Sequence, residues 1–212
     1  MTELPTTYKH LVDRFEEIIY DNMAIKLAAF RGFQENISSD YEKTMKSFPL
    51  INFVVESLLV DIVITTNKIV EANSDRTINY LLNFTDNNFK ILNNHFPKVT
   101  KEMISRNKAE LEALEDQFKR LKTQRDKYYA HSDKEYFLEP GRIMKDFPNT
   151  FDDLTDVIIV LKGMISEHRL AIEGSMRVCI SEFVYVNTYK TVDLLKSASV
   201  DWFKKYRPDE TF

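Results

Sequence analysis

Apolar residues recur at helical spacing along most of the chain, with charged residues between them. Leu11, Phe15 and Ile18, for example, are separated by four and three positions, which places them on one face of a helix. The same pattern predicts helices over residues 7–38, 50–72, 77–87, 99–130 and from about 150, and a last helix that ends near Lys205. The sequence therefore predicts an all-α protein.

The junctions between these helices carry turn and capping residues. The Asn-Ser-Asp triplet at 73–75 offers capping side chains to the helix that starts at Thr77, and a looser segment follows that helix as far as Pro97. Asn149 or Thr150 is expected to cap the fifth helix.

Two further segments complete the expected architecture. A loop is predicted over about 132–148, where Pro140 and Gly141 lie, and a polar tail from about residue 206. The run 178–186 fits either a strand or the start of the last helix. We expect one domain over residues 1–212, built as an antiparallel bundle of four to five main helices with a short extra helix.

Composition agrees with a helical protein. The 212 residues include only four Gly and six Pro, too few for the tight turns of a many-stranded fold. Cys179 is the only cysteine, so no internal disulfide can form, and the composition is typical of a reducing cytoplasm. The net charge of −4 argues against a surface coated with positive charge for non-specific nucleic-acid binding.

Neither a membrane span nor a signal peptide is expected. The most apolar segment, residues 50–70, is interrupted by Glu56, Asp61 and Lys68, and its apolar residues cover most of the helix circumference. It is therefore expected to be the central core helix. The first thirty residues carry acidic side chains that the apolar core of a signal peptide would not tolerate.

Arg125 interrupts the apolar face of the helix predicted over 99–130. Steps of three and four residues along that face run from Ile104 through Leu111 and Leu121 to Arg125, so the arginine takes a position suited to leucine. A charge that breaks the pattern of its own helix indicates a functional site.

The same stretch supplies groups for acid–base chemistry on RNA. On a straight helix Arg125 and His131 would point about 120° apart. Either the helix loosens before His131 or the partner groups come from a second copy of the chain. Two histidines could serve as base and acid in RNA cleavage, and the arginine could stabilise the charge on phosphorus, without a metal. Asp126 or Asp133 could orient these groups.

Positive residues gather around this stretch. Residues 117–127 carry five positive side chains and one acid. Lys122, Lys127 and Lys134 are candidate phosphate contacts, and Tyr128 or its neighbour is a candidate stacking platform for an unpaired base. The alternative is structural, because basic residues suit a helix C-terminus and helical tyrosines usually pack.

The segment RDKYYAH, residues 125–131, resembles the ribonuclease motif of the HEPN superfamily, which is Arg, four to six residues, then His. The wider string QRDKYYAHSD and the SDRTINYLL segment, residues 74–82, are most similar to its abortive-infection U-type branch. The resemblance implies a helical bundle, a homodimer with a composite site, and a metal-independent endoribonuclease of phage defence or a toxin. It implies a 2',3'-cyclic phosphate product, catalytic roles for Arg125 and His131, and a supporting role for Asp126.

The partners expected are RNA, a second copy of the chain and an antitoxin of nucleotidyltransferase type; no cofactor, metal or membrane is expected. The alternative function is a catalytically inactive binding module in which Arg125 forms a structural ion pair, with Glu56 or Asp61 as candidate acids. His168 continues the apolar face of the fifth helix and is interpreted as an interior histidine with a hydrogen-bond partner. Cys179 is interpreted as a buried filler.

Overall fold

The computed structural model describes residues 3–37, 49–71, 74–130, 134–139 and 142–206, and every regular element in these ranges is helical. The prediction of an all-α protein is confirmed. The elements are α1 (Glu3–Glu16), η1 (Glu17–Ala24), α2 (Ile25–Ile37), α4 (Pro49–Val70), α5 (Ile78–Asn87), α6 (Phe89–His95), α7 (Lys101–Ala113), α8 (Glu115–Gln124), η2 (Arg125–Ala130), α9 (Lys134–Leu138), α10 (Arg142–Asp146), α11 (Thr150–Glu173) and α12 (Ser181–Tyr206). The η elements are π-helical.

The chain divides into two compact units. Unit 1 consists of Met1–Met23 and Ile62–Val178, and unit 2 of Ala24–Asp61 and Cys179–Phe212. The expectation that residues 1–212 form one domain stays a prediction.

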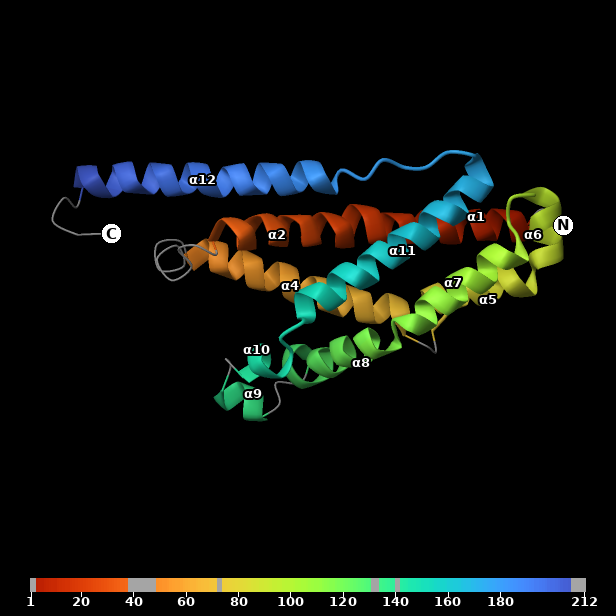
Figure 1. Ribbon diagram of the computed structural model, residues 1–212, viewed down its shortest axis with the longest axis horizontal. Helices are drawn as coiled ribbons and strands as arrows, with labels where there is room; N and C mark the ends of the chain where they lie inside the picture. The colour runs from red at the N-terminus through yellow and green to blue at the C-terminus, as the bar shows by residue number, and fades with distance from the viewer. Residues whose placement is uncertain (1–2, 38–48, 72–73, 131–133, 140–141, 207–212) are drawn as a thin grey trace. The chain divides into compact units, whose positions relative to one another are not determined.

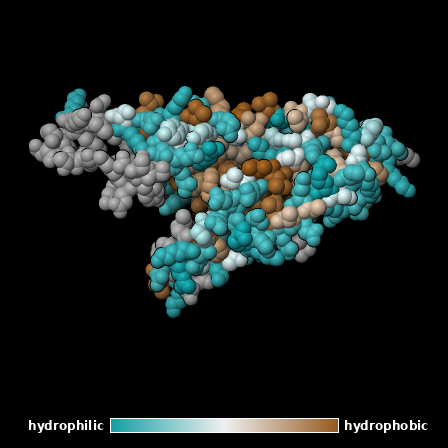
Figure 2. Space-filling view, in the orientation of Figure 1, coloured by the Kyte–Doolittle hydropathy of each residue, from teal (hydrophilic) through white to brown (hydrophobic). Residues whose placement is uncertain are grey.

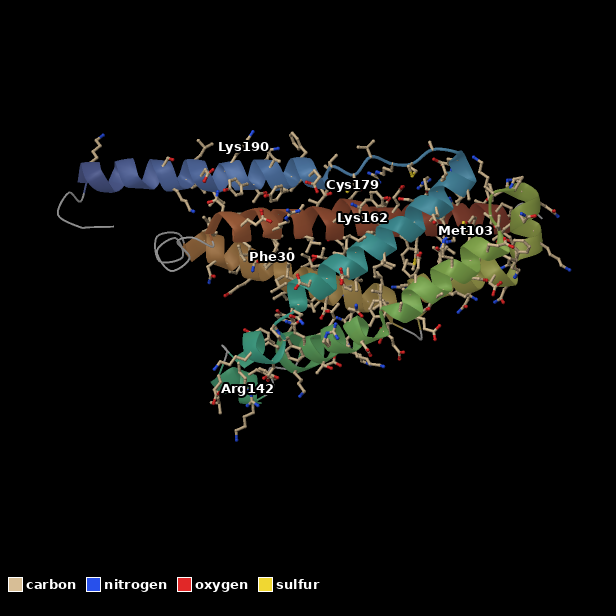
Figure 3. All side chains as sticks on the ribbon, viewed as in Figure 1. Phe30, Met103, Arg142, Lys162, Cys179 and Lys190 are labelled. Carbon is tan, nitrogen blue, oxygen red and sulfur yellow. The ribbon has the colours of Figure 1, made fainter. Side chains whose placement is uncertain are left out.

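Unit 1 is a helical bundle. Within it α1 packs on α11, and α5 and α7 run antiparallel with α6 between them in the chain (Figure 1). Its fully buried side chains include Ile78, Leu81, Leu92, Ile104, Leu121 and Leu154. Tyr20 of η1 donates a hydrogen bond of 3.4 Å to the carbonyl oxygen of Lys162. Lys162, labelled in Figure 3, lies on α11.

Threonine side chains begin two helices of unit 1. Thr77 accepts a hydrogen bond from the backbone N–H of Tyr80, and Thr100 accepts one from Met103. The cap of α5 is therefore Thr77 itself, not the triplet at 73–75, of which residue 73 lies outside the described residues. Threonine accepts hydrogen bonds from the free backbone N–H groups at a helix start, as serine, asparagine and aspartate do. The prediction that a polar side chain caps α5 is therefore right, but the residue it named is wrong.

Three short helices replace predicted irregular segments. α6 occupies the looser segment before Pro97, and α9 and α10 occupy described parts of the predicted loop at 132–148. In α9 and α10, Tyr136 and Ile143 are buried, and Tyr136 donates a 2.7 Å hydrogen bond to Asp146. Helices of five to seven residues are too short to show a period, so tertiary contacts must select them. Hydrophilic side chains cover most of the face of α9 and α10 seen in Figure 2.

α11 begins without a side-chain cap. Asn149 is the N-cap residue, one of the two predicted, but its side chain makes no capping hydrogen bond, and the Thr150 hydroxyl donates to the carbonyl of Phe147 instead. Asp152 and Asp153 lie in the first turn, where negative charge complements the helix dipole. The helix ends at Gly174, whose φ of 72° is left-handed and suits glycine.

Unit 2 pairs α2 with α12. Gly32 of α2 allows this approach, since a Cβ there would lie 2.9 Å from the carbonyl oxygen of Tyr185. The Asn36 amide donates hydrogen bonds to Tyr189 and Asp193 of α12. The ambiguous run 178–186 is resolved as an irregular segment followed by helix from residue 181.

Among the described residues, one helix is long and apolar enough to cross a membrane by length and composition alone, namely α4 over Leu50–Val70. The core helix of a soluble protein, mostly buried, can pass the same test, whereas 28% of the most apolar part of this helix is buried. Its second half is core in unit 1, where Ile62 and Val63 are fully buried. In unit 2, Asp61 forms a 2.5 Å ion pair with Lys26. The expectation of a central core helix therefore holds for the second half, while Leu50 and Phe53 are exposed.

Candidate active site

The apolar face that leads to Arg125 is buried as predicted. Ile104, Leu111, Leu114 and Leu121 are all buried, and they belong to α7 and α8 of unit 1. The helix is not continuous, because Leu114 ends α7 and begins α8 with φ −92° and ψ 7°. The apolar face continues along α8 as far as Arg125.

Arg125 is the first residue of the π-helical segment η2. Its side chain is 21% exposed, and its Nε donates a 2.7 Å hydrogen bond to Asp126 Oδ1. π-helical turns are rare and frequently occur at functional sites. The helix therefore departs from α geometry over Arg125–Ala130, the described part of the motif. Which of the two alternatives brings Arg125 and His131 to one site stays a prediction. His131 and Asp133 lie outside the described residues.

Arg125 lines a cleft of about 550 Å³ in unit 1. The other lining residues come from the ends of α4 and α5 and from α7 and α8, and they are Asn67, Val70, Glu71, Asn79, Leu82, Asn83, Lys108, Leu111, Glu112, Glu115, Phe118, Lys119 and Lys122. The cleft thus has four positive and three negative side chains around an apolar floor.

Ion pairs neutralise part of the basic stretch that precedes the motif. Lys119 contacts Glu115 at 3.1 Å, and this hydrogen bond raises the pKa of Lys119. Arg120 forms a two-pronged pair with Asp153 of α11. Lys122, which lines the cleft, is exposed and keeps its place as a candidate phosphate contact.

The remaining predicted RNA-binding residues are described but do not line this cleft. Lys127 and Lys134 are exposed. The Tyr128 ring makes edge-on contacts with Tyr129 at 4.9 Å and with Tyr136 at 6.2 Å between centroids. Tyr128 is thus half-buried within an aromatic cluster, as the structural interpretation of this tyrosine expected.

A family model for AbiU2, a family of HEPN domains, matches residues 7–193. The chain belongs to the AbiU2 family. The matched segment contains the cleft and both Arg125 and His131. No curated protein and no solved structure matches the chain.

His168 of this AbiU2-family protein lies away from the cleft, in the core of unit 1. It is fully buried, with Nδ1 2.6 Å from the Tyr8 hydroxyl and Nε2 3.4 Å from the Asn107 amide nitrogen. Burial lowers the pKa of His168 to about 4 and raises that of Tyr8. The interpretation of His168 as an interior histidine with a hydrogen-bond partner is confirmed.

Within the described residues of this AbiU2-family protein, no group of three or more His, Cys, Asp or Glu side chains is placed to hold a metal ion. Cys179 is half-buried and lies 3.2 Å from the Ser181 hydroxyl, so it is less enclosed than a buried filler.

The sequence did not single out most of the cleft. Asn79 and Asn83 are four residues apart on α5, and that spacing was the available signal for a polar face. Glu71 and Glu112 follow apolar helix positions and carry no pattern of their own. Their convergence in this AbiU2-family protein depends on how α4, α5 and α7 pack.

Proposed function

We propose that this protein is a metal-independent endoribonuclease of the HEPN type, acting in phage defence or as a toxin in the cytoplasm. The observation that carries the proposal is Arg125, a partly buried arginine that opens on a cleft and begins a π-helical segment. The family match supports the same activity, because it includes the whole Arg-to-His motif.

The chemistry assigns one task to each group. A His131 imidazole takes the proton of the RNA 2'-hydroxyl, and the 2'-oxygen attacks phosphorus. A second His131, from another copy of the chain, gives a proton to the departing 5'-oxygen as the P–O5' bond breaks. The products are a 2',3'-cyclic phosphate and a 5'-hydroxyl end.

Arg125 stabilises the negative charge that grows on the phosphoryl oxygens. Asp126, which accepts a hydrogen bond from Arg125 Nε, fixes the direction of the guanidinium. Because this bond uses Nε, the terminal nitrogens of the planar fork still carry donors for a phosphate, although one of them also lies 2.6 Å from Asp126.

The assay is cleavage of labelled RNA in EDTA, with the new ends identified by mass spectrometry. Arg125→Ala and His131→Ala should each lower kcat about 100-fold or more, the scale for loss of one transition-state donor. Matched controls are Arg76→Ala and His10→Ala, because both side chains are exposed. Cleavage by the motif variants at the wild-type rate contradicts the proposal.

The second candidate is a binding module without catalysis. The Arg125–Asp126 ion pair is the observation that favours it, since a structural arginine would be paired in the same way. The predicted partners of Arg125 have other contacts, because Asp61 pairs with Lys26 and Glu56 accepts a hydrogen bond from Asn52. A module of this kind would bind RNA without cleaving it and would not change the RNA ends.

A homodimer and an antitoxin of nucleotidyltransferase type belong to the same proposal. The dimer is needed because one imidazole cannot act as base and acid in the same step. Sedimentation velocity tests the dimer, and co-purification with the product of a neighbouring nucleotidyltransferase gene tests the antitoxin.

A further inference from the structure

The cleft beside Arg125 has an apolar floor. Leu82 and Leu111 are buried there, and Phe118 is half-buried, so its ring is partly exposed to the cleft. The volume of about 550 Å³ lies within the range of roughly 300–1,000 Å³ for small-molecule sites. A flat aromatic ligand suits such a floor, because it can stack on the partly exposed ring of Phe118.

The polar rim of the cleft changes character along its length. Lys122 and Arg125 lie toward the η2 end of the rim, and Glu112 and Glu115 precede them along the chain. Lys108 and Lys119 also line the cleft, but they are paired with Asp86 and Glu115. Glu115 and Arg125 are ten residues apart on α8 and η2, which corresponds to about 15 Å along an α-helix. A phosphate suits the basic end alone, since carboxylates would repel it at the other end.

Hydrogen-bond acceptors dominate the acidic part of the rim. Glu115 already pairs with Lys119, whereas no ion pair among the described residues involves Glu71 or Glu112. Asn83 is exposed on α5 and offers an amide with both a donor and an acceptor. This set complements a ligand edge rich in N–H groups.

We propose that this cleft is a base-recognition subsite, which holds one unpaired guanine of the RNA substrate next to the scissile nucleotide. The guanine ring stacks on Phe118. Its Watson–Crick edge presents two adjacent N–H donors, and a carboxylate such as Glu112 accepts both. The RNA backbone then runs toward Lys122 and Arg125. This assignment rests on the proposed ribonuclease function, since it makes RNA the ligand.

The test uses oligonucleotides that cannot be cleaved. Ten-residue 2'-O-methyl RNAs, uridine throughout except for one central guanosine, inosine or adenosine, are titrated by fluorescence anisotropy at fixed salt. Inosine lacks the exocyclic amine, so it should bind about 10-fold more weakly than guanosine, within the discrimination of a good bidentate contact. Glu112→Gln should bring the ratio of the inosine Kd to the guanosine Kd close to one.

Matched variants separate recognition from folding. Glu102→Gln changes an exposed glutamate on the same helix outside the cleft and should leave the ratio at its wild-type value. Phe118→Ala should weaken all three oligonucleotides about 5-fold or more, because stacking does not depend on the base. GMP alone should bind more weakly than the guanosine oligonucleotide, since it lacks the neighbouring phosphates.

The outcomes distinguish the subsite from the ribonuclease function. Equal binding of the three oligonucleotides, an unchanged ratio in Glu112→Gln, or GMP binding that the oligonucleotide cannot displace overturns the subsite. If RNA cleavage depends on Arg125 but ignores guanine, the function stands and the subsite fails. If guanine preference depends on Glu112 and no RNA is cleaved, the cleft stands as a guanine-binding site for RNA and the ribonuclease function fails.

Discussion

Titration of His168 should make this protein sensitive to acid. The imidazole is fully buried between Tyr8 of α1 and Asn107 of α7, and burial lowers its pKa to about 4. In the unfolded chain the pKa is about 6.5. As the pH falls below 6.5 the unfolded state binds the proton first, so the free energy of unfolding declines until about pH 4, where the folded state also binds it.

The size of this effect follows from the two pKa values. Between pH 7.5 and pH 5, His168 alone should lower the free energy of unfolding by about 2 kcal/mol. That is a large share of the roughly 5–15 kcal/mol that stabilises a typical domain. His168→Gln removes the titration and keeps an amide that can hydrogen-bond to Tyr8, so the variant should be less stable at pH 7.5 but lose less on acidification.

Urea unfolding followed by circular dichroism at pH 7.5, 6.5, 5.5 and 5.0 measures both effects. One protein concentration should be used throughout, because a dimer makes stability depend on concentration. His95→Gln is the matched control, since His95 is exposed at the end of α6. An acid-dependent loss of stability that is the same in His168→Gln and in wild type would show that the buried imidazole is not its source.

Three further predictions concern stability. Arg169→Met should cost about 3–5 kcal/mol in urea unfolding, because it leaves the buried Glu16 with only a longer contact of 3.9 Å to Arg177, and adding Glu16→Leu should recover part of the loss. Gly32→Ala should lower the free energy of unfolding by about 1–3 kcal/mol, read from Tm, because its Cβ meets the backbone of Tyr185; no change in Tm would contradict the close packing of α2 on α12. Thr100→Ala should cost about 1 kcal/mol and Thr100→Ser much less, and equal losses would argue against capping of α7.

The main helices could be predicted because each carries a long periodic pattern. The face through Ile104, Leu111 and Leu121 is buried as expected, and the break of that face at Arg125 identified the cleft residue. Helical periodicity alone determines which side chains lie on this face. The end of α7 at Leu114 could not be predicted from the sequence, because leucine is compatible both with a continuous helix and with a helix end.

Other features depend on contacts between distant segments. Tyr8 and His168 are 160 residues apart, so the sequence could predict a buried histidine but not its partner. Asn79 and Glu71 reach the cleft from α5 and the end of α4. These residues lie near Arg125 because of the way the helices pack, and no local sequence pattern predicts that packing. The short helices α9 and α10 were missed for the same reason.

The most direct measurement of the central claim is single-turnover RNA cleavage with enzyme in excess, in EDTA, by wild type and Arg125→Ala. Excess enzyme separates the chemical step from binding. If Arg125 stabilises the transition state, the cleavage rate of Arg125→Ala falls about 100-fold or more, while its affinity for uncleavable 2'-O-methyl RNA changes much less. A cleavage rate equal to that of wild type, or a loss explained entirely by weaker RNA binding, would contradict the assignment of Arg125 to the transition state.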